Sequence, residues 1–268
     1  MSEPAGKDQA MTTTYAPGTP NWVDLGTTDI DGAKEFYGTT LGWTFEPLAD
    51  AGEYHLIRSG GRVVAGLGTA TDAARGTSWA VYFAVADADG TAREVDAQGG
   101  KVVVAPTDVH DKGRLAVFQD PAGAYFSVWQ GRALPGAELV AADGAMCWAE
   151  LATTDLAGAK RFYPGVLPVR ARDIDVSEVP YAVLEREEGV VAGLYAVTPE
   201  LDAVGEHAPP HWSVYFAVAD CDAVADQALA MGATELLRET TPPGRMALMH
   251  DPQGGKFCVI TPDPTFSM

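Results

Sequence analysis

Cysteine is scarce in this chain of 268 residues. Only Cys147, Cys221 and Cys258 are present, and no two of them form a Cys-x-x-Cys pair. Cysteines so few and so far apart build neither a paired disulfide framework nor a structural zinc site of the usual spacing. We therefore expect reduced thiols and a cytoplasmic protein.

Long apolar runs are also missing. None reaches the roughly 18 residues that a membrane-spanning helix requires. Residues 1–18 are polar and lack the apolar stretch of a signal peptide. We expect these residues to form a disordered tail, and we expect no membrane partner.

Positive charge is low. The chain has 18 lysine and arginine residues against 37 aspartate and glutamate residues, which gives a formal charge of −19. A surface of this sign repels a phosphate backbone, and no basic stripe offsets the repulsion. Nucleic acid is therefore excluded as a partner. The sequence also has neither a Gly-x-Gly-x-x-Gly loop after a strand nor a His-Glu-x-x-His motif, so a dinucleotide site and a zincin site are not expected.

What the sequence does contain is a repeat. Residues 22–29 match 148–155 at an offset of 126, residues 79–87 match 212–220 at 133, and the Asp-Pro-x-Gly at 120–123 returns at 251–254 at 131. Three collinear blocks at nearly constant offset indicate an internal duplication.

Each copy divides again into two similar halves. Residues 22–29 alternate as a strand does and end at Asp29, a suitable N-cap for the helix that follows. Residues 79–87 repeat this pattern before a helix at 88–97, with Gly99 as its left-handed cap. Short β-rich runs follow each helix, and the Asp-Pro-x-Gly segments are typical of type I turns. The pattern therefore predicts four βαβββ modules.

These modules predict an α+β fold of two tandem domains. The expected boundaries are a tail at 1–18, domain 1 at 19–130 with modules 20–70 and 78–130, a linker at 131–144, and domain 2 at 145–263 with modules 146–198 and 210–262. The copies are not identical, because Pro164 stands where the first copy has Gly38. We expect Pro164 to stop or kink its helix, and one of the two copies to be degenerate.

The motifs resemble a known family. Asp29-x3-Ala33-x2-Phe36-Tyr37 and the Asp-Pro-x-Gly-x-x-Phe at 120–126 are similar to the vicinal oxygen chelate superfamily, which includes glyoxalase I, extradiol dioxygenases, and bleomycin and fosfomycin resistance proteins. Residues 19–25 and 211–218 resemble its tandem-domain actinobacterial "hydroxylase" or glyoxalase-like members. The resemblance implies that the curled mixed sheet of each domain forms a cleft for a small-molecule ligand, in a monomer or homodimer.

The resemblance also implies where metal-using members hold their ion, at four positions in each domain. These positions are Trp22, Ala80, Ser127 and Gly66 in the first copy, and Trp148, Ser213, Cys258 and Gly193 in the second. Indole has no free lone pair, and alanine and glycine side chains offer no donor, so only Cys258 is a plausible ligand. We therefore expect no metal and no cofactor, which argues against glyoxalase and dioxygenase chemistry. A separate site at His207 and His211 stays open, although Pro209 and Pro210 between them disfavour a helix.

Strand alternation then predicts what lines the clefts. Asp24 shares a face with Trp22, and Glu150 shares one with Trp148. We predict Asp24 and Glu150 as general bases, with Tyr82 and Tyr215 as proton donors. The candidate substrate-binding residues are Trp22, Trp148, Tyr125, Ser127, Trp129, Arg114, Arg245, Ser213 and Cys258.

Two interpretations of these residues remain open. In one, each carboxylate acts as a base on a flat, partly aromatic, oxygen-bearing metabolite of secondary metabolism, by enolisation, cyclisation, dehydration or epimerisation. In the other, the aromatic side chains are ordinary core, and Asp24 and Glu150 pair with Arg114 and Arg245. A non-catalytic protein that sequesters a drug or metabolite, as bleomycin-resistance proteins do, is the alternative function.

Overall fold

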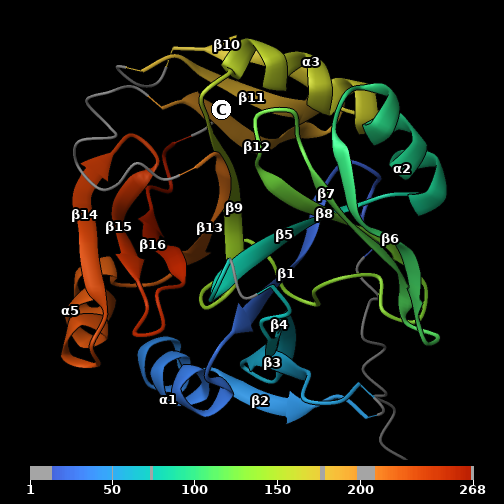
Figure 1. Ribbon diagram of the computed structural model, residues 1–268. Helices are drawn as coiled ribbons and strands as arrows, with labels where there is room; N and C mark the ends of the chain where they lie inside the picture. The colour runs from blue at the N-terminus through green and yellow to red at the C-terminus, as the bar shows by residue number, and fades with distance from the viewer. Residues whose placement is uncertain (1–13, 50, 73–74, 176–178, 198–208, 267–268) are drawn as a thin grey trace, which may run out of the picture.

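The computed structural model describes residues 14–266 except residues 50, 73–74, 176–178 and 198–208 (Figure 1). Its elements follow the order strand, helix and three strands four times, as the sequence predicts. In domain 1 they are β1 Pro20–Thr27, α1 Ile30–Leu41, β2 Thr44–Pro47, β3 His55–Ser59, β4 Arg62–Thr69, β5 Ser78–Ala84, α2 Ala88–Ala97, β6 Lys101–Val109, β7 Gly113–Gln119 and β8 Tyr125–Gly131. In domain 2 they are β9 Met146–Thr153, α3 Leu156–Val166, β10 Arg170–Ile174, β11 Tyr181–Arg186, β12 Gly189–Ala196, β13 His211–Ala217, α5 Cys221–Ala230, β14 Thr234–Thr241, β15 Gly244–His250 and β16 Lys256–Pro262.

An aspartate begins every one of these helices. The Asp29 carboxylate accepts a hydrogen bond from the amide of Gly32 at 3.0 Å, which satisfies one of the first-turn donors of α1. Asp87, Asp155 and Asp220 cap α2, α3 and α5 in the same way. These caps end the preceding strand and turn the chain sharply, so the strand side chains near each cap have fixed orientations.

Each domain forms one mixed sheet of eight strands. The order is β2-β3-β4-β1-β5-β8-β7-β6 in domain 1 and β10-β11-β12-β9-β13-β16-β15-β14 in domain 2. The opening strands of the two modules, β1 and β5, lie antiparallel at the centre, and each is parallel to the last strand of its own module. The sheet of each domain therefore has a central pair of strands on which both modules place side chains.

The two faces of each sheet have different roles. Val23 and Leu25 of β1 are buried in a core that also contains Ala149 and Leu151 of β9, so the inner faces of both sheets share one hydrophobic interior. Trp22 and the other side chains of the opposite face form a separate cluster. Figure 1 shows α1 beside α5 and α2 beside α3, which brings helices of different domains together.

Paired tyrosines and aspartates cross the domain interface. The hydroxyl of Tyr37 in α1 donates to Asp251 of domain 2 at 2.9 Å, and the hydroxyl of Tyr163 in α3 donates to Asp120 of domain 1 at 3.0 Å. Both aspartates belong to the Asp-Pro-x-Gly turns and also accept backbone amides there. The turn motif that identifies the repeat therefore also joins the two copies.

Three segments differ from the sequence-based expectation. Helix α3 continues through Pro164 to Val166, because a proline in the last turn costs only a hydrogen bond near the end of the helix. The predicted linker is tied to domain 1 by hydrogen bonds from Asn21 to Pro135 at 2.9 Å and from Trp129 to Leu134 at 2.7 Å. Residues 14–18 of the predicted tail are also ordered, since Gly18 bonds to Ala84; residues 1–13 lie outside the described residues. None of the described helices is long and apolar enough to cross a bilayer.

Candidate functional site

A cavity of about 380 Å³ opens on the outer face of the domain 1 sheet. Its walls are mostly aromatic and aliphatic, from Trp22, Tyr54, Tyr82, Leu115 and Trp129. Asp24 is the one carboxylate on β1 that lines it, and the side chain is half-buried. The alternation along β1 therefore correctly predicts that Trp22 and Asp24 share a face, and Tyr82 on β5 joins them.

Two tyrosine hydroxyls bind the Asp24 carboxylate. Tyr82 donates to Oδ2 at 3.0 Å and Tyr54 donates to the same oxygen at 3.2 Å. Among the described residues, no hydrogen bond reaches the other oxygen, Oδ1. Tyr54 in turn accepts the indole N–H of Trp22 at 3.1 Å, and Ser127 lies in register with Tyr82. Asp24 is thus held by one oxygen, and its second oxygen accepts no hydrogen bond from the described residues.

The surroundings raise the pKa of Asp24 to about 6. Burial is the main cause, because it penalises the charged form, and the hydrogen bonds from Tyr82 and Tyr54 offset part of the increase. Burial also raises the pKa of Tyr54 and of Tyr82 well above the usual value, and the nearby Asp24 charge adds to it. At neutral pH the carboxylate is therefore ionised and both phenols are hydrogen-bond donors.

Tyr54 is a site residue that the sequence reasoning missed. It stands just before β3, outside the strands on which alternation was used, and its side chain extends across β4 to reach Asp24. The repeat contains a signal for it, since Tyr181 occupies the equivalent position in domain 2 at an offset of 127. Tyr54 and Tyr181 stand at matched positions in the two copies, as Asp24 and Glu150 do, and this match is the sequence signal that predicts both tyrosines as site residues.

The mouth of the cavity is formed by the hairpin between β6 and β7. Asp108, Val109, His110 and Lys112 of this hairpin line the cavity. His110 has a left-handed backbone with φ of 46°, which is uncommon for a residue with a side chain. The equivalent hairpin of domain 2 has a Pro-Pro pair at 242–243 instead. The two hairpins therefore differ in their charged and titratable groups.

Other predicted residues of domain 1 lie on β8. Ser127 and Trp129 are buried on the cavity side, and Ser127 stands in register with Tyr82. Tyr125 lies farther along the strand, where Arg75 stacks on its ring at 4.2 Å. Arg75 also lowers the pKa of Asp24, although less than the two tyrosines do. The predicted side chains of β8 therefore extend the aromatic surface away from the carboxylate.

Domain 2 repeats the arrangement around Glu150. Tyr215 donates to Oε2 at 2.6 Å, and Tyr181 donates to Oε1. Burial raises the pKa of Glu150, and these bonds offset part of the increase. Unlike Asp24, Glu150 has both carboxylate oxygens bonded to protein. Glu150 is therefore engaged by its own domain more completely than Asp24 is.

Two further predicted residues of domain 2 flank Glu150. Ser213 is buried and stands in register with Glu150, while the Cys258 thiol is fully buried beside Tyr215. Burial raises the pKa of the Cys258 thiol well above its usual value, so the thiol is neither a ready nucleophile nor a ready metal ligand.

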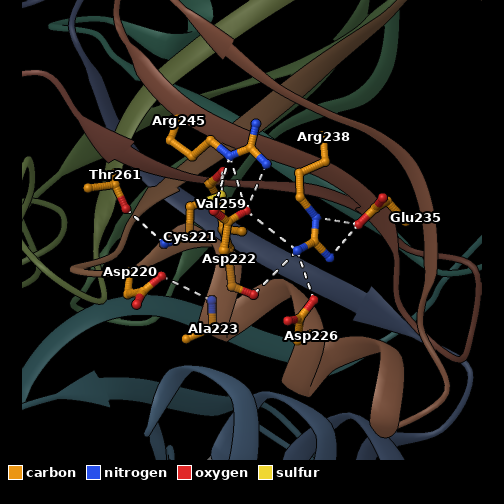
Figure 2. A network of polar contacts seen from close by, with 10 residues as sticks. All are labelled: Asp220, Cys221, Asp222, Ala223, Asp226, Glu235, Arg238, Arg245, Val259 and Thr261. Atoms are coloured by element: carbon orange, nitrogen blue, oxygen red, sulfur yellow. Dashed lines mark hydrogen bonds and ion pairs between the residues drawn. The ribbon is translucent and has the colours of Figure 1, made fainter.

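Arg114 and Arg245 lie away from both carboxylates. Arg114 donates to Asp89 of α2 and Asp108 of β6, at 2.9 and 3.0 Å. Arg245 binds Asp222 of α5 at 2.9 Å, in a network that also includes Arg238, which contacts the same aspartate at 3.5 Å (Figure 2). The interpretation in which these arginines pair with Asp24 and Glu150 is therefore not supported. Arg114 alternates with Leu115, which lines the cavity, and so points to the helix side of the sheet.

The candidate histidine site is only partly described. His207 lies outside the described residues. His211 contacts the carbonyl of Pro209 at 2.9 Å and Lys256 at 3.3 Å. Among the described residues, no group of three or more histidine, cysteine, aspartate or glutamate side chains is arranged to hold a metal ion.

Comparison with known proteins agrees with this architecture. The family model of the Glyoxalase/Bleomycin resistance protein/Dioxygenase superfamily matches residues 19–128, and that of the Glyoxalase-like domain matches residues 148–260. The chain is 38% identical over 265 residues to the anthracycline biosynthesis protein DnrV of Streptomyces peucetius, covering 92% of this chain and 94% of that protein. The chain belongs to the glyoxalase/bleomycin resistance/dioxygenase superfamily.

Solved structures of this superfamily share the fold at low sequence identity. The 2,2',3-trihydroxybiphenyl 1,2-dioxygenase of Sphingomonas wittichii strain RW1 aligns with a TM-score of 0.62 and 14% identity, covering 92% of this chain and 91% of that chain. The Mn(II)-bound glyoxalase of Novosphingobium aromaticivorans aligns with a TM-score of 0.60 and 17% identity, covering 92% and 88%. At this identity the likeness concerns the fold alone.

The residues present in domain 1 do not fit the superfamily's metal. A Cβ atom placed on Gly66 would lie 1.8 Å from the Tyr54 hydroxyl oxygen, so the space for a side chain at this position is already filled. The groups around Gly66 are the Asp24 carboxylate, an indole N–H, a serine hydroxyl and two protonated phenols. Asp108 and His110 also line the cavity, but among the described residues no three carboxylate, imidazole or thiol groups are arranged to hold one ion. A divalent ion needs several carboxylate, imidazole or thiolate donors that converge on one point. Phenols with a pKa well above 10 do not supply them.

Proposed function

We propose that this superfamily member is a metal-independent enzyme that uses Asp24 as a general base on a small molecule bound in the domain 1 cavity. One observation carries the proposal. A half-buried carboxylate with a pKa of about 6 stands in an aromatic cavity, with one oxygen held by two tyrosines and the other accepting no hydrogen bond from the part of the chain that the structure describes. A base of this pKa is ionised at neutral pH and still strong enough to remove a proton from an activated position.

The cavity walls suit a flat, partly aromatic ligand that bears oxygen substituents. Trp22 and Trp129 offer ring faces for stacking, and Lys112 and His110 at the mouth offer polar contacts to ketone or hydroxyl groups. The relative DnrV is described as an anthracycline biosynthesis protein, and anthracyclines are hydroxylated polycyclic ketones of this shape. We propose a substrate of this chemical class and a role in secondary metabolism.

The proposed reaction begins with enolisation. Asp24 Oδ1 removes a proton from a carbon beside a ring ketone, the C–H electrons form a C=C bond, and the carbonyl oxygen becomes an enolate. Protonation makes Asp24 neutral and weakens its hold on the Tyr82 hydroxyl, which can then donate to the enolate oxygen. Return of the proton to the opposite face of the same carbon gives epimerisation. Loss of a β-hydroxyl, which takes the Asp24 proton and leaves as water, gives dehydration. Attack of the enolate carbon on a second carbonyl, whose oxygen takes the proton, gives cyclisation.

Domain 1 is the proposed catalytic domain. Asp24 has an oxygen without a protein donor, while both oxygens of Glu150 are bonded to tyrosines. The domain 1 hairpin also carries His110 and Lys112, whereas its counterpart carries two prolines. Glu150, Tyr215 and their neighbours remain a predicted second site, which we propose to be structural or to bind ligand without turnover.

Asp24→Asn tests the proposal. The probe is a tetracyclic anthracycline aglycone with a ring ketone, incubated in deuterium oxide, and the measurement is the rate at which its carbon-bound protons exchange, followed by mass spectrometry. Asparagine cannot accept the proton, so we expect the rate to fall by about 10²-fold or more while the dissociation constant, from calorimetry, changes little. Asp31→Asn, at an exposed position in the first turn of α1, is the matched control. An undiminished rate in the Asp24 variant would refute the role of Asp24.

Sequestration is the second candidate function. The aromatic cavity is sufficient for it, and the net charge of −19 favours a cationic ligand. It requires that the wild-type protein bind the aglycone or a cationic, sugar-bearing anthracycline tightly and exchange no protons. The same experiment therefore separates the two functions.

A further inference from the structure

We propose that Gly66 and Tyr54 form a positioning pair, in which the missing side chain at Gly66 allows the Tyr54 hydroxyl to hold and orient the Asp24 carboxylate. The proposal rests on the proposed role of Asp24 and extends it to two residues that do not touch the reacting atoms. It also explains what occupies one of the positions at which the superfamily resemblance implies a metal ligand.

The steric part of the argument concerns the Gly66 position on β4. A Cβ atom there would lie 1.8 Å from the hydroxyl oxygen of Tyr54 and 2.5 Å from its Cζ atom. Contacts this short are not tolerated, and the phenol is the free end of a side chain, so the phenol is what must move. Gly66 is not among the residues with positive φ, so its backbone conformation does not itself require glycine. The space that Tyr54 needs is therefore the reason for a glycine here.

The electrostatic part concerns what Tyr54 does in that space. Its hydroxyl accepts the Trp22 indole N–H at 3.1 Å and donates to Asp24 Oδ2 at 3.2 Å. Among the described contacts, the Trp22 indole N–H donates to the Tyr54 hydroxyl alone. Because the Tyr54 oxygen accepts this bond, its own proton is directed to Asp24. The groups that face Asp24 are the hydroxyls of Tyr54 and Tyr82 and, farther away, the guanidinium of Arg75. Tyr54 thus opposes the effect of burial and keeps the carboxylate ionised.

Domain 2 provides an independent instance of the pair. A Cβ atom on Gly193 would lie 2.1 Å from the Tyr181 hydroxyl, which donates to Glu150. Gly66 stands in register with Asp24, and Gly193 stands in register with Glu150. Both copies therefore keep the glycine and the tyrosine although the carboxylate has changed length, which indicates that the two residues act together.

The test is a titration of Asp24 that needs no substrate. The protein is labelled with ¹³C at the aspartate carboxyl groups, and the Asp24 resonance is identified as the one missing in Asp24→Asn. Loss of one hydrogen bond to the carboxylate destabilises its charged form, so we expect Tyr54→Phe to raise the pKa of Asp24 by about one unit. We expect Gly66→Ala to raise it by a similar amount, because alanine displaces the hydroxyl.

A double variant and a control make the test specific. Because both changes act through one hydroxyl, Tyr54→Phe combined with Gly66→Ala should shift the pKa no further than either change alone. Gly26→Ala, on the neighbouring strand β1, is the control, since a Cβ atom there would lie 3.5 Å from Ala70 and touches no tyrosine. It should leave the Asp24 titration unchanged.

Several results would overturn the pairing. An unchanged titration in Tyr54→Phe would mean that Tyr54 does not hold the carboxylate. This change removes only the hydroxyl and keeps the ring, so the variant should fold and the titration can be interpreted. A shift in Gly66→Ala that adds to that of Tyr54→Phe would mean that Gly66 acts by another route. If the titration behaves as expected but Asp24→Asn leaves proton exchange intact, the pair stands and the proposed catalysis fails.

Discussion

At the scale of single residues, the position of Asp24 is costly for the fold. A carboxylate loses hydration when it is buried, and two phenol hydrogen bonds recover only part of that loss. A packing position would be served better by a neutral side chain. The cost is therefore itself an argument that the acid has a use, because sites that act on ligands are where proteins keep unfavourable groups.

This cost has a defined pH dependence. The pKa of Asp24 rises from 3.8 in the unfolded chain to about 6 in the folded protein, so between these values the folded state binds more protons than the unfolded state. Stability contributed by this site is then lost as pH rises through that window, by about 3 kcal/mol in all. We expect Asp24→Asn to gain stability relative to the wild type from pH 4 to pH 7, measured by urea unfolding at each pH.

The comparison has a built-in check. Asp31→Asn, which alters an exposed aspartate of α1, should run parallel to the wild type over the same range. If the difference between wild type and Asp24→Asn stays constant from pH 4 to pH 7, then Asp24 does not have a raised pKa and the account of its environment is wrong.

At the scale of elements, the sequence predicts the modules well, because strand alternation, Asp caps and turn motifs are all local. The face shared by Trp22, Asp24 and Tyr82 follows from a period of two along β1 and β5. Tyr54 could not be found in this way, since it precedes its strand and reaches the site by the length of its side chain. The short edge strand β2 has a weak local signal, because Phe45 is the only large apolar side chain among its four residues.

Two other elements differ from their sequence patterns for reasons of tertiary structure. The glycine- and proline-rich segment after β8 resembles a flexible linker, but Leu134 lines the cavity and the backbone of 134–138 bonds to domain 1. Arg114 and Arg245 are matched in the repeat, and each binds an aspartate of the adjacent helix. A matched position in a duplicated chain thus indicates a shared role but does not say which role.

At the scale of the whole molecule, the two domains are parts of one core. Phe83 of domain 1 contacts Trp212 of domain 2 with ring centroids 5.2 Å apart, and Trp79 contacts Phe216 at 4.9 Å. The crossed pairs of Tyr37 with Asp251 and Tyr163 with Asp120 are buried within this aromatic interface, because the two tyrosine rings contact Trp79 and Trp212. The domains should therefore unfold together.

Tyr37→Phe tests this unity. The change removes a buried donor from Asp251, so we expect a loss of about 1–2 kcal/mol in the free energy of unfolding. Calorimetry should show a single transition whose midpoint falls, with Tyr125→Phe, away from the interface, as the control. Two separate transitions, of which only one moves, would show that the domains are energetically independent.

The central claim, that Asp24 is the base in a metal-free cleft, is tested most directly by the pH dependence of proton exchange on the aglycone probe. Only the ionised carboxylate can accept a proton, so the logarithm of the rate should rise with a slope of one below pH 6 and level off above it. The measurement is made after treatment with a chelator, and the rate should not change on that treatment. A rate that is flat between pH 5 and pH 8, or one that is lost with the chelator and restored by a divalent ion, would contradict the account.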